Sequence, residues 1–384
     1  MTVTSVYLDY NASTPLLPRV EKSYLKASHH FGNPSSFHRP GNLAKELVEE
    51  SRVLVLDFLG ADPGQLIFTG SGTEANNLVL NRVLAKHLKG TPTHFITSEI
   101  EHSSILNTAQ YFETLGIKVT YLPVNQEGVI QIDRLEQEIT KHTTLISLML
   151  ANNETGVIQP IKEAALMAKN KHIPIHTDAA QAIGRYVFTV SDLGIDYLTL
   201  SGHKCYGPKG IGGLYSKDPQ TLDSLIRGGS QEFGKRAGTL NTSGIAAFGC
   251  ALSLLKKSIA SDIQHMSHLK NMFITQLKIS LPNITFNGNP DQSLSNTINV
   301  SFNVSDYEAI LMNLDLAGIY ASSGSACSTG SHEPSHVIQA MTSDPKRINS
   351  ATRFSLGKMT TLKEIDYVLD TLPKIIKKLD KVNT

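Results

Sequence analysis

The sequence predicts an α/β fold, with a mostly parallel sheet in a large domain and a smaller α/β domain at the C-terminal end. Between about residues 40 and 250, short apolar runs alternate with helical patterns, which is typical of a parallel sheet covered by helices. After about residue 258 the pattern changes, and 384 residues exceed the length at which one core keeps growing. We therefore expect a large domain over 15–258 and a small domain formed by 259–384 with 1–14.

The predicted strands of the large domain are short and mostly apolar. They cover 65–69, 94–97, 118–122, 144–150, 173–176, 197–200 and 213–215, with helices predicted over 44–59, 74–88, 103–115 and 161–170. In the small domain we expect a helix near 262–280, a strand over 296–302, a helix near 306–317 and a Gly/Ser-rich loop over 322–332. The last helix opens with a capping box, Thr361 to Glu364, and a break or kink is expected at Pro373.

The composition indicates an ordinary globular protein of a reducing compartment. Its 35 basic and 34 acidic side chains nearly cancel, so no nucleic-acid or membrane surface is expected. Three cysteines, Cys205, Cys250 and Cys327, lie far apart without a C-x-x-C motif. The N-terminus resembles no secretory signal and no window reaches transmembrane length. These observations predict a cytoplasmic protein that does not span a membrane.

Lys204 lies directly after the predicted strand 197–200, between Ser201 and a Gly/Pro turn. Desolvation at the end of a core strand lowers the pKa of a lysine and frees its amine to form a Schiff base with an aldehyde cofactor. A lone lysine in such a turn is more often an ordinary surface residue. The interpretation therefore depends on what the other strands deliver to the same edge of the sheet.

The stretch 69–77, Thr-Gly-Ser-Gly-Thr-Glu-Ala-Asn-Asn, joins a strand to a helix. Its glycines allow close backbone approach, and the helix start offers free N–H groups to a phosphate. The same stretch fits G-x-G-x-x-A, with Glu99 as a possible ribose acid, so a dinucleotide site is the rival interpretation.

Three further strands end in polar residues. Asp178 lies 26 residues before Lys204, and a carboxylate there can pair with a protonated pyridine nitrogen. His102 and Asn153 follow two other strands. Each has a structural alternative, such as a helix cap for Asp178. Their convergence at one sheet edge is what favours a catalytic site.

In order and spacing, these motifs resemble those of class V pyridoxal phosphate (PLP) enzymes. Together with Arg-Ala-Gly-Thr at 236–239, Ser-Ser-Gly-Ser-Ala-Cys at 322–327 and Arg-Phe-Ser-Leu-Gly at 353–357, the chain resembles a cysteine desulfurase of the NifS/IscS type. The resemblance runs from Tyr7 to about Asp366. It implies PLP-dependent transferase fold type I, with 15–258 as the PLP-binding domain.

The resemblance also implies a role for each matching position. Lys204 is expected to hold PLP through its amine, Asp178 to pair with the pyridine nitrogen and His102 to stack on the ring. Arg353 is expected to hold the substrate carboxylate, since its planar fork can grip one through two bonds. The other expected cofactor contacts are Gln181 at the phenolic oxygen, Gly72, Thr73, Ser201 and His203 at the phosphate, Thr239 from a second subunit, and Asn153 beside both PLP and the substrate.

Cys327 decides which PLP reaction is expected. The resemblance implies that Lys204 removes the Cα proton of L-cysteine and that the Cys327 thiolate then attacks the substrate sulfur, leaving a persulfide and alanine. The small residues around Cys327 predict a mobile loop. Cys250, in an apolar context, is predicted to be a small buried residue, and Cys205 is also expected to be structural.

Several alternatives accompany this prediction. Another class V enzyme, such as a selenocysteine lyase or an aminotransferase, would use the same cofactor site, and a scaffold that has lost catalysis is a non-enzymatic alternative. His332 to His336 fits H-E-x-x-H, but Pro334 disfavours the single helical face that zinc needs, so no metal is expected. The resemblance implies a homodimer and a sulfur-acceptor protein, either an iron–sulfur scaffold or a carrier for tRNA thiolation.

Overall fold

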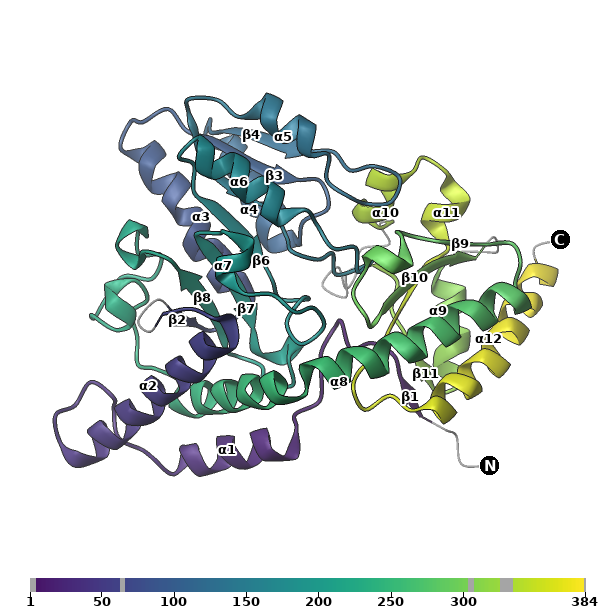
Figure 1. Cartoon of the computed structure of the whole chain (residues 1–384), viewed down its shortest axis with the longest axis horizontal. Helices are drawn as coiled ribbons and strands as arrows, with labels where there is room; N and C mark the ends of the chain where they lie inside the picture. Colours follow the sequence, from purple (N-terminus) through teal and green to yellow (C-terminus); the bar gives the residue numbers. More distant parts are fainter. Residues whose placement is uncertain (1–4, 63–65, 303–306, 325–333, 383–384) are drawn as a thin grey trace.

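The computed structural model describes residues 5–62, 66–302, 307–324 and 334–382. Figure 1 shows a large sheet with its helices on one side of the molecule and smaller sheets on the other side. The long helix α8 (Thr242–Ser280) runs along both parts.

The large sheet has seven strands in the order β2-β8-β7-β6-β5-β3-β4. Its strands are β2 (Leu66–Thr69), β3 (His94–Ser98), β4 (Lys118–Leu122), β5 (Thr143–Ser147), β6 (Ile175–Asp178), β7 (Tyr197–Ser201) and β8 (Gly212–Ser216). Strand β8 is antiparallel to both of its neighbours, whereas the other pairs are parallel. The predicted mostly parallel sheet is confirmed. Strand β5 ends before residue 150, but Leu148 and Leu150 still donate to the carbonyls of His176 and Asp178.

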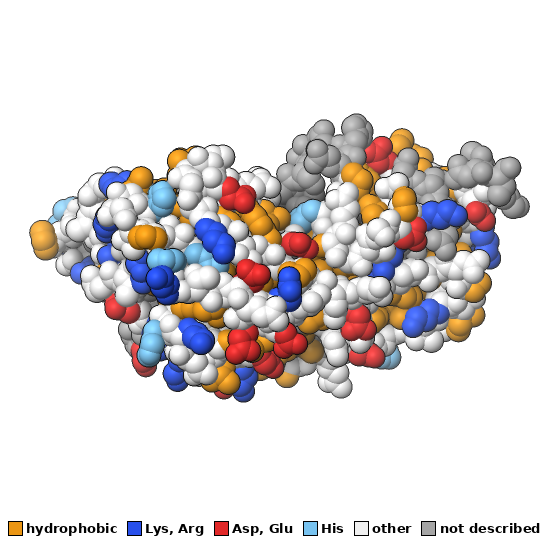
Figure 2. Space-filling view, turned by 90° about the horizontal axis from the view of Figure 1, so that it is seen from above, with side chains coloured by type: hydrophobic (Ala, Val, Ile, Leu, Met, Phe, Trp, Pro, Cys, Tyr) orange, Lys and Arg blue, Asp and Glu red, His pale blue; other side chains and the backbone are white. Residues whose placement is uncertain are grey.

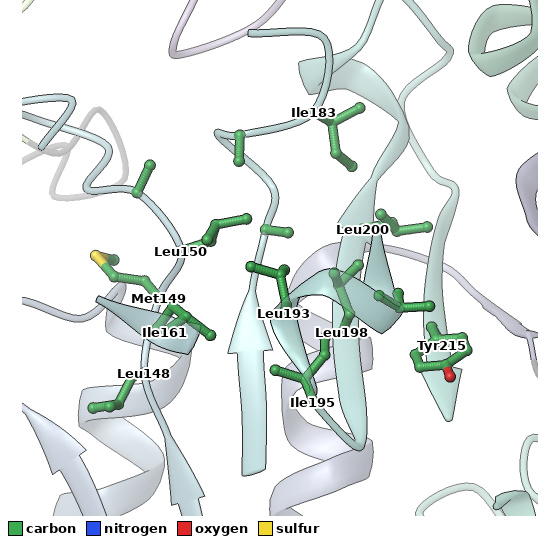
Figure 3. Close-up of a cluster of buried hydrophobic side chains, with 14 of the residues drawn as sticks. Leu148, Met149, Leu150, Ile161, Ile183, Leu193, Ile195, Leu198, Leu200 and Tyr215 are labelled. Carbon is green, nitrogen blue, oxygen red and sulfur yellow. The ribbon is translucent and has the colours of Figure 1, made fainter. Parts of the chain in front are cut away.

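Helices cover both faces of this sheet because side chains alternate along each strand. In β2, Leu66 and Phe68 pack into one core and Ile67 into the other. Figure 3 shows part of the first core, where Leu198 of β7 lies near Ile195. The helices of this part are α1 (Pro18–Ser28), α2 (Arg39–Leu59), α3 (Gly72–Leu88), α4 (Ser103–Thr114), α5 (Ile132–Glu138), α6 (Ile161–Asn170) and α7 (Val190–Leu193).

The second part of the molecule has its own core. An antiparallel sheet in the order β12-β10-β9 and a parallel pair of β1 with β11 surround a cluster that includes Val6, Phe273, Phe302 and Phe354. Its elements are β1 (Val6–Tyr7), β9 (Ile284–Phe286), β10 (Thr297–Phe302), α9 (Tyr307–Leu316), β11 (Ile319–Tyr320), α10 (His336–Met341), α11 (Pro345–Asn349), β12 (Ala351–Ser355) and α12 (Leu362–Val382).

Helix α8 differs most from the sequence prediction, since it begins at Thr242 rather than near 262. Its first turns show no amphipathic pattern because they are enclosed by α1 and α2. A Cβ at Gly249 would lie 2.9 Å from the Cα of Ser51 in α2, so the two backbones are in close contact. By length and composition alone α8 could cross a membrane, which the sequence prediction had excluded, but half of its most apolar window is buried against the rest of the protein.

The last helix also differs in one respect. Its capping box is confirmed, because Thr361 N donates to Glu364 Oε2 at 2.6 Å and Glu364 N donates to Thr361 Oγ1 at 3.3 Å. Of the predicted break or kink at Pro373, the break was wrong, since α12 continues to Val382 with Pro373 inside it. Leu372 and Ile376 on either side of Pro373 are buried in the second core, and this packing offsets the lost backbone bond.

On the face in Figure 2, Lys/Arg and Asp/Glu side chains are interspersed.

Candidate active site

One cavity of about 160 Å³ brings together the residues that end separate strands of the large sheet. Among its lining are ten residues that the sequence analysis selected: Gly72, Thr73, His102, Asn153, Asp178, Gln181, Ser201, His203, Lys204 and Arg353. Asn11, Asn76 and Ser104 also line it and were not predicted. A larger hollow of about 670 Å³ lies at the opposite ends of β6 and β7, lined by residues such as Lys169 and Lys217, and contains none of the predicted site residues.

The start of α3 forms one end of the cavity. Ser71 caps the helix by accepting a hydrogen bond from Glu74 N at 3.1 Å, which leaves the first N–H groups of the helix facing the cavity. A Cβ on Gly72 would lie 3.2 Å from the Cβ of Ser201, and a Cβ on Gly212 would lie 2.6 Å from the carbonyl carbon of Ser71. At Gly212 a side chain would clash with the backbone of Ser71, and at Gly72 it would be tightly crowded, so both glycines allow the close packing that presents a helix start suited to an anion.

Lys204 follows β7 in a short turn, Gly202–Lys204. Its Nζ donates to the carbonyl oxygens of Asn11 at 2.5 Å and Ala12 at 2.9 Å, so the amine is held at the cavity by the N-terminal segment. Beside it, burial and the charges of Lys204, Lys209 and Arg185 lower the pKa of His203 to about 4. This imidazole is therefore neutral at physiological pH and can donate one hydrogen bond and accept another.

Asp178 ends β6 with both carboxylate oxygens engaged. Oδ1 accepts from Ala180 N at 2.9 Å, and Oδ2 accepts from Asn76 Nδ2 at 2.7 Å. Asn76 also donates to Ser104 Oγ at 2.9 Å, while its own Oδ1 is buried with no hydrogen-bond partner among the described residues. Nδ1 of His102 accepts from Ser104 N at 3.1 Å, which fixes the ring at the start of α4.

Arg353 lies on β12 of the second part of the molecule and lines the cavity. It is 1% exposed. Its Nη1 donates to the carbonyl of Asn153 at 3.0 Å and its Nη2 to Asp9 Oδ1 at 2.7 Å. The Nε–H is buried with no partner among the described residues. This guanidinium thus retains donors suited to a ligand carboxylate.

Two buried titratable groups lie behind the cavity. Burial raises the pKa of Glu101 to about 8, and its Oε1 accepts from Ser98 Oγ and from the backbone N of Met149. Burial lowers the pKa of His176 to about 4, and its ring nitrogens contact Ser147 Oγ and Thr199 Oγ1. Both side chains are therefore uncharged near neutral pH and support the strand ends without adding charge.

The remaining predicted positions lie elsewhere. Thr239 lines a separate small hollow beside Gly70 rather than the main cavity, and Cys327 lies outside the described residues. Cys205 is buried, and burial raises the pKa of its thiol to about 12, whereas Cys250 is only half-buried, contrary to the prediction. Cys250 faces α1, where its Sγ lies 3.8 Å from the carbonyl of Arg19, and this surface position leaves it partly open.

The dinucleotide interpretation finds no geometric support among the described residues. Glu99 is exposed and does not line the cavity, so it cannot act there as a ribose acid. The described residues contain no cluster of His, Cys, Asp or Glu able to hold a metal ion, and His332 of the H-E-x-x-H stretch lies outside them.

The donor set fits PLP. A helix start suits the phosphate, the Asp178 carboxylate suits a protonated pyridine nitrogen, the Lys204 amine suits the aldehyde, and the His102 ring can stack on the pyridine face. The Oδ1 of Asn76, which has no hydrogen-bond partner in the described part of the chain, adds a buried acceptor from a residue that lines the same cavity. This fold and this set of side chains define a PLP-dependent enzyme of fold type I.

Comparisons with known proteins identify the family. The model of the aminotransferase class-V family matches residues 6–368. The cysteine desulfurase IscS of Dictyoglomus turgidum is 42% identical over 98% of this chain and 96% of its own length, and that of Clostridium botulinum is 42% identical over 97% and 94%. A solved NifS-like protein superposes with a TM-score of 0.91 and 33% identity, covering 98% of this chain and all of its own. The chain belongs to the class-V aminotransferase family and, within it, to the PLP-dependent cysteine desulfurases.

Proposed function

We propose that this enzyme converts L-cysteine to L-alanine and transfers the sulfur first to Cys327 and then to an acceptor protein. The observation that carries the proposal is the meeting of Lys204, Asp178 and the start of α3 in one cavity of a chain that is 42% identical to cysteine desulfurases. Arg353 adds the cation that an amino acid substrate needs for its carboxylate.

PLP, when bound, supplies the electron sink that makes the Cα–H bond of an amino acid acidic. In our proposal the phosphate lies at Gly72, Thr73, Ser201 and His203, and Gln181 contacts the phenolic oxygen. The Asp178 carboxylate keeps the pyridine nitrogen protonated, and His102 excludes water from one face of the ring. Lys204 Nζ removes the Cα proton, since an amine freed from a covalent bond can act as a general base. The same amine, now protonated, is the proton donor in the later reprotonation step.

The sulfur step belongs to Cys327. Its thiolate attacks the substrate sulfur, a new S–S bond forms, and the Cβ–S bond breaks. The electron pair of that bond stays with the carbon fragment, which takes up a proton and leaves as alanine. Asn153 and Arg353 hold the substrate in place during this step, because attack requires a sulfur fixed within van der Waals distance of the thiolate.

Two features of the assembly are part of the same proposal. Thr239 lies next to the phosphate end but outside the cavity, which is compatible with a homodimer in which it contacts the partner's cofactor. Residues 15–258 would form the PLP-binding domain, and 259–384 with 1–14 the small domain that carries the Cys327 loop. The second core is consistent with this division, since it includes Val6 of β1, although α8 runs unbroken through residue 258.

The expected location is the cytoplasm, and the expected acceptors are iron–sulfur scaffold proteins or carriers for tRNA thiolation. The relatives named IscS motivate the first of these. Pull-down of persulfide-loaded enzyme with each class of acceptor, followed by sulfur transfer, would distinguish the two.

Product analysis tests the reaction. With L-cysteine and a reductant, we expect equal amounts of sulfide and alanine from the wild type and loss of sulfide from Cys327→Ala with PLP still bound. A selenocysteine lyase would prefer the selenium substrate and tolerate that substitution. An aminotransferase would leave the amino group on the cofactor and form a keto acid, so either result would refute the desulfurase assignment.

A further inference from the structure

Two segments that flank Cys327 meet at one buried carboxylate. Gly324 precedes Cys327 and Ser335 follows it. Ser335 Oγ donates to Glu154 Oε2 at 2.5 Å. Gly324 lies against the same group, since a Cβ there would be 3.0 Å from Oε2 and 3.3 Å from Oε1 of Glu154. The Glu154 side chain therefore contacts both ends of the segment that carries the cysteine.

Glu154 lies directly behind the cavity, and its backbone is held on both sides of the residue. It is 0% exposed and follows Asn153, which lines the cavity. Its backbone N donates to Asn152 Oδ1 at 2.9 Å, and its carbonyl accepts from Asn299 Nδ2 of β10 at 3.1 Å. A buried carboxylate is costly unless it is well paired, yet Oε1 of Glu154 has no hydrogen-bond partner among the described residues.

Other contacts support each end of the same segment. On the side before Cys327, the backbones of Ser322 and Arg353 exchange hydrogen bonds of 3.1 and 2.6 Å. On the side after it, His336 Nε2 lies 3.0 Å from the carbonyl oxygen of Glu101. The carboxylate of Glu154 touches both sides of the segment, whereas each of these other contacts supports one side.

We propose that Glu154 is a positioning residue that ties together the two segments flanking Cys327 and so fixes the position of this cysteine relative to the cavity. The inference rests on the proposed function, because the sulfur-accepting role of Cys327 is what makes its position matter for turnover. Loss of the contact should slow sulfur transfer and leave the binding of PLP and cysteine intact, since Glu154 does not line the cavity.

Ser335 offers variants that separate this contact from helix capping. Its Oγ also accepts from Ile338 N at 3.1 Å as the N-cap of α10. Asp and Asn are both good N-caps, but only Asn can also donate to Glu154, whereas Asp repels it. Ser335→Asp therefore breaks the contact and keeps the cap, and Ser335→Asn keeps both. Ser350→Ala is a control, since it removes a buried serine hydroxyl bonded to the Lys346 carbonyl in α11.

The first readout needs no turnover. Alkylation of Cys327 in holoenzyme without substrate is followed by mass spectrometry of its peptide. We expect labelling about fivefold faster in Ser335→Asp and Glu154→Ala than in the wild type, because Ser335 loses its hydrogen bond to Glu154 and is held less tightly. Ser335→Asn and Ser350→Ala should label at the wild-type rate.

The second readout is steady-state kinetics with L-cysteine. In Ser335→Asp, kcat should fall about tenfold while KM stays within about twofold, as expected when only the transfer geometry is lost. Equal labelling and equal kcat in Ser335→Asp and Ser335→Asn would overturn the proposal. If the wild type releases no sulfide, the proposed function fails, and the labelling contrast still decides whether Glu154 positions Cys327.

Discussion

Asn76 is expected to set the affinity of the enzyme for PLP, although it was not predicted from the sequence. Its Nδ2 donates to Asp178 Oδ2 at 2.7 Å, and the remaining partner of this carboxylate among the described residues is the backbone N of Ala180. A hydrogen bond to a charged group contributes about 1.5–3 kcal/mol. This hydrogen bond is already present in the site without PLP, so only the share of its free energy that orients Asp178 affects the binding of PLP. We therefore expect Asn76→Ala to raise the Kd for PLP about tenfold, the lower end of that range.

The neighbouring residue provides a matched control. Asn77 donates to the Thr73 carbonyl at 2.9 Å and accepts from Thr108 Oγ1 at 3.1 Å, and it does not line the cavity. Apo-enzyme titrated with PLP and followed by absorbance should give weaker binding for Asn76→Ala and wild-type binding for Asn77→Ala. Equal affinities in the two variants would refute the argument that Asn76 orients Asp178.

Three further predictions concern pH, stability and substrate binding. The pKa of buried His176 is lowered to about 4, so below about pH 6.5 the unfolded chain binds a proton that the folded chain does not yet bind. The free energy of unfolding should therefore fall as the pH drops from 6.5 towards 4. In thermal unfolding, His176→Asn should reduce this pH dependence by up to about 1.4 kcal/mol per pH unit. Glu232→Gln should destabilise the protein by about 3–5 kcal/mol in denaturant unfolding, because the carboxylate is buried against Arg52 at 2.7 Å; a loss below about 1 kcal/mol would contradict this. Arg353→Lys should raise KM for cysteine about tenfold, because lysine lacks the planar fork that holds a carboxylate. Asp9→Asn keeps the guanidinium and should change KM far less. Equal effects of the two substitutions on KM would indicate that Arg353 has a structural role only.

The sequence predicted the sheet and part of the cavity lining from local patterns, whereas Gln181, His203 and Arg353 were expected from the family resemblance. Short apolar strands between helical patterns fix the parallel sheet, and the polar residues that end these strands meet at one edge. Asp178, Lys204 and Gly72 could be found in this way because each lies within a few residues of a strand end.

Other features depend on contacts between distant segments and escaped prediction. Asn11 enters the cavity from the N-terminal segment, where no strand or helix pattern marks it. Asn76 lies within helix α3, where an asparagine usually indicates no function, and only the fold brings it to Asp178. The early start of α8 was missed because burial on several sides removes the amphipathic pattern, and Pro373 is accepted within α12 because packing on both sides stabilises the helix.

Sulfur transfer to Cys327 is tested most directly by the mass of the Cys327 peptide after one turnover. Holoenzyme is mixed with an equimolar amount of L-cysteine without reductant, and its peptides are analysed together with released alanine. We expect one added sulfur on Cys327 for each alanine formed, and no addition in Lys204→Ala. Alanine released while Cys327 remains unmodified, or sulfur added to Cys250 instead, would contradict it.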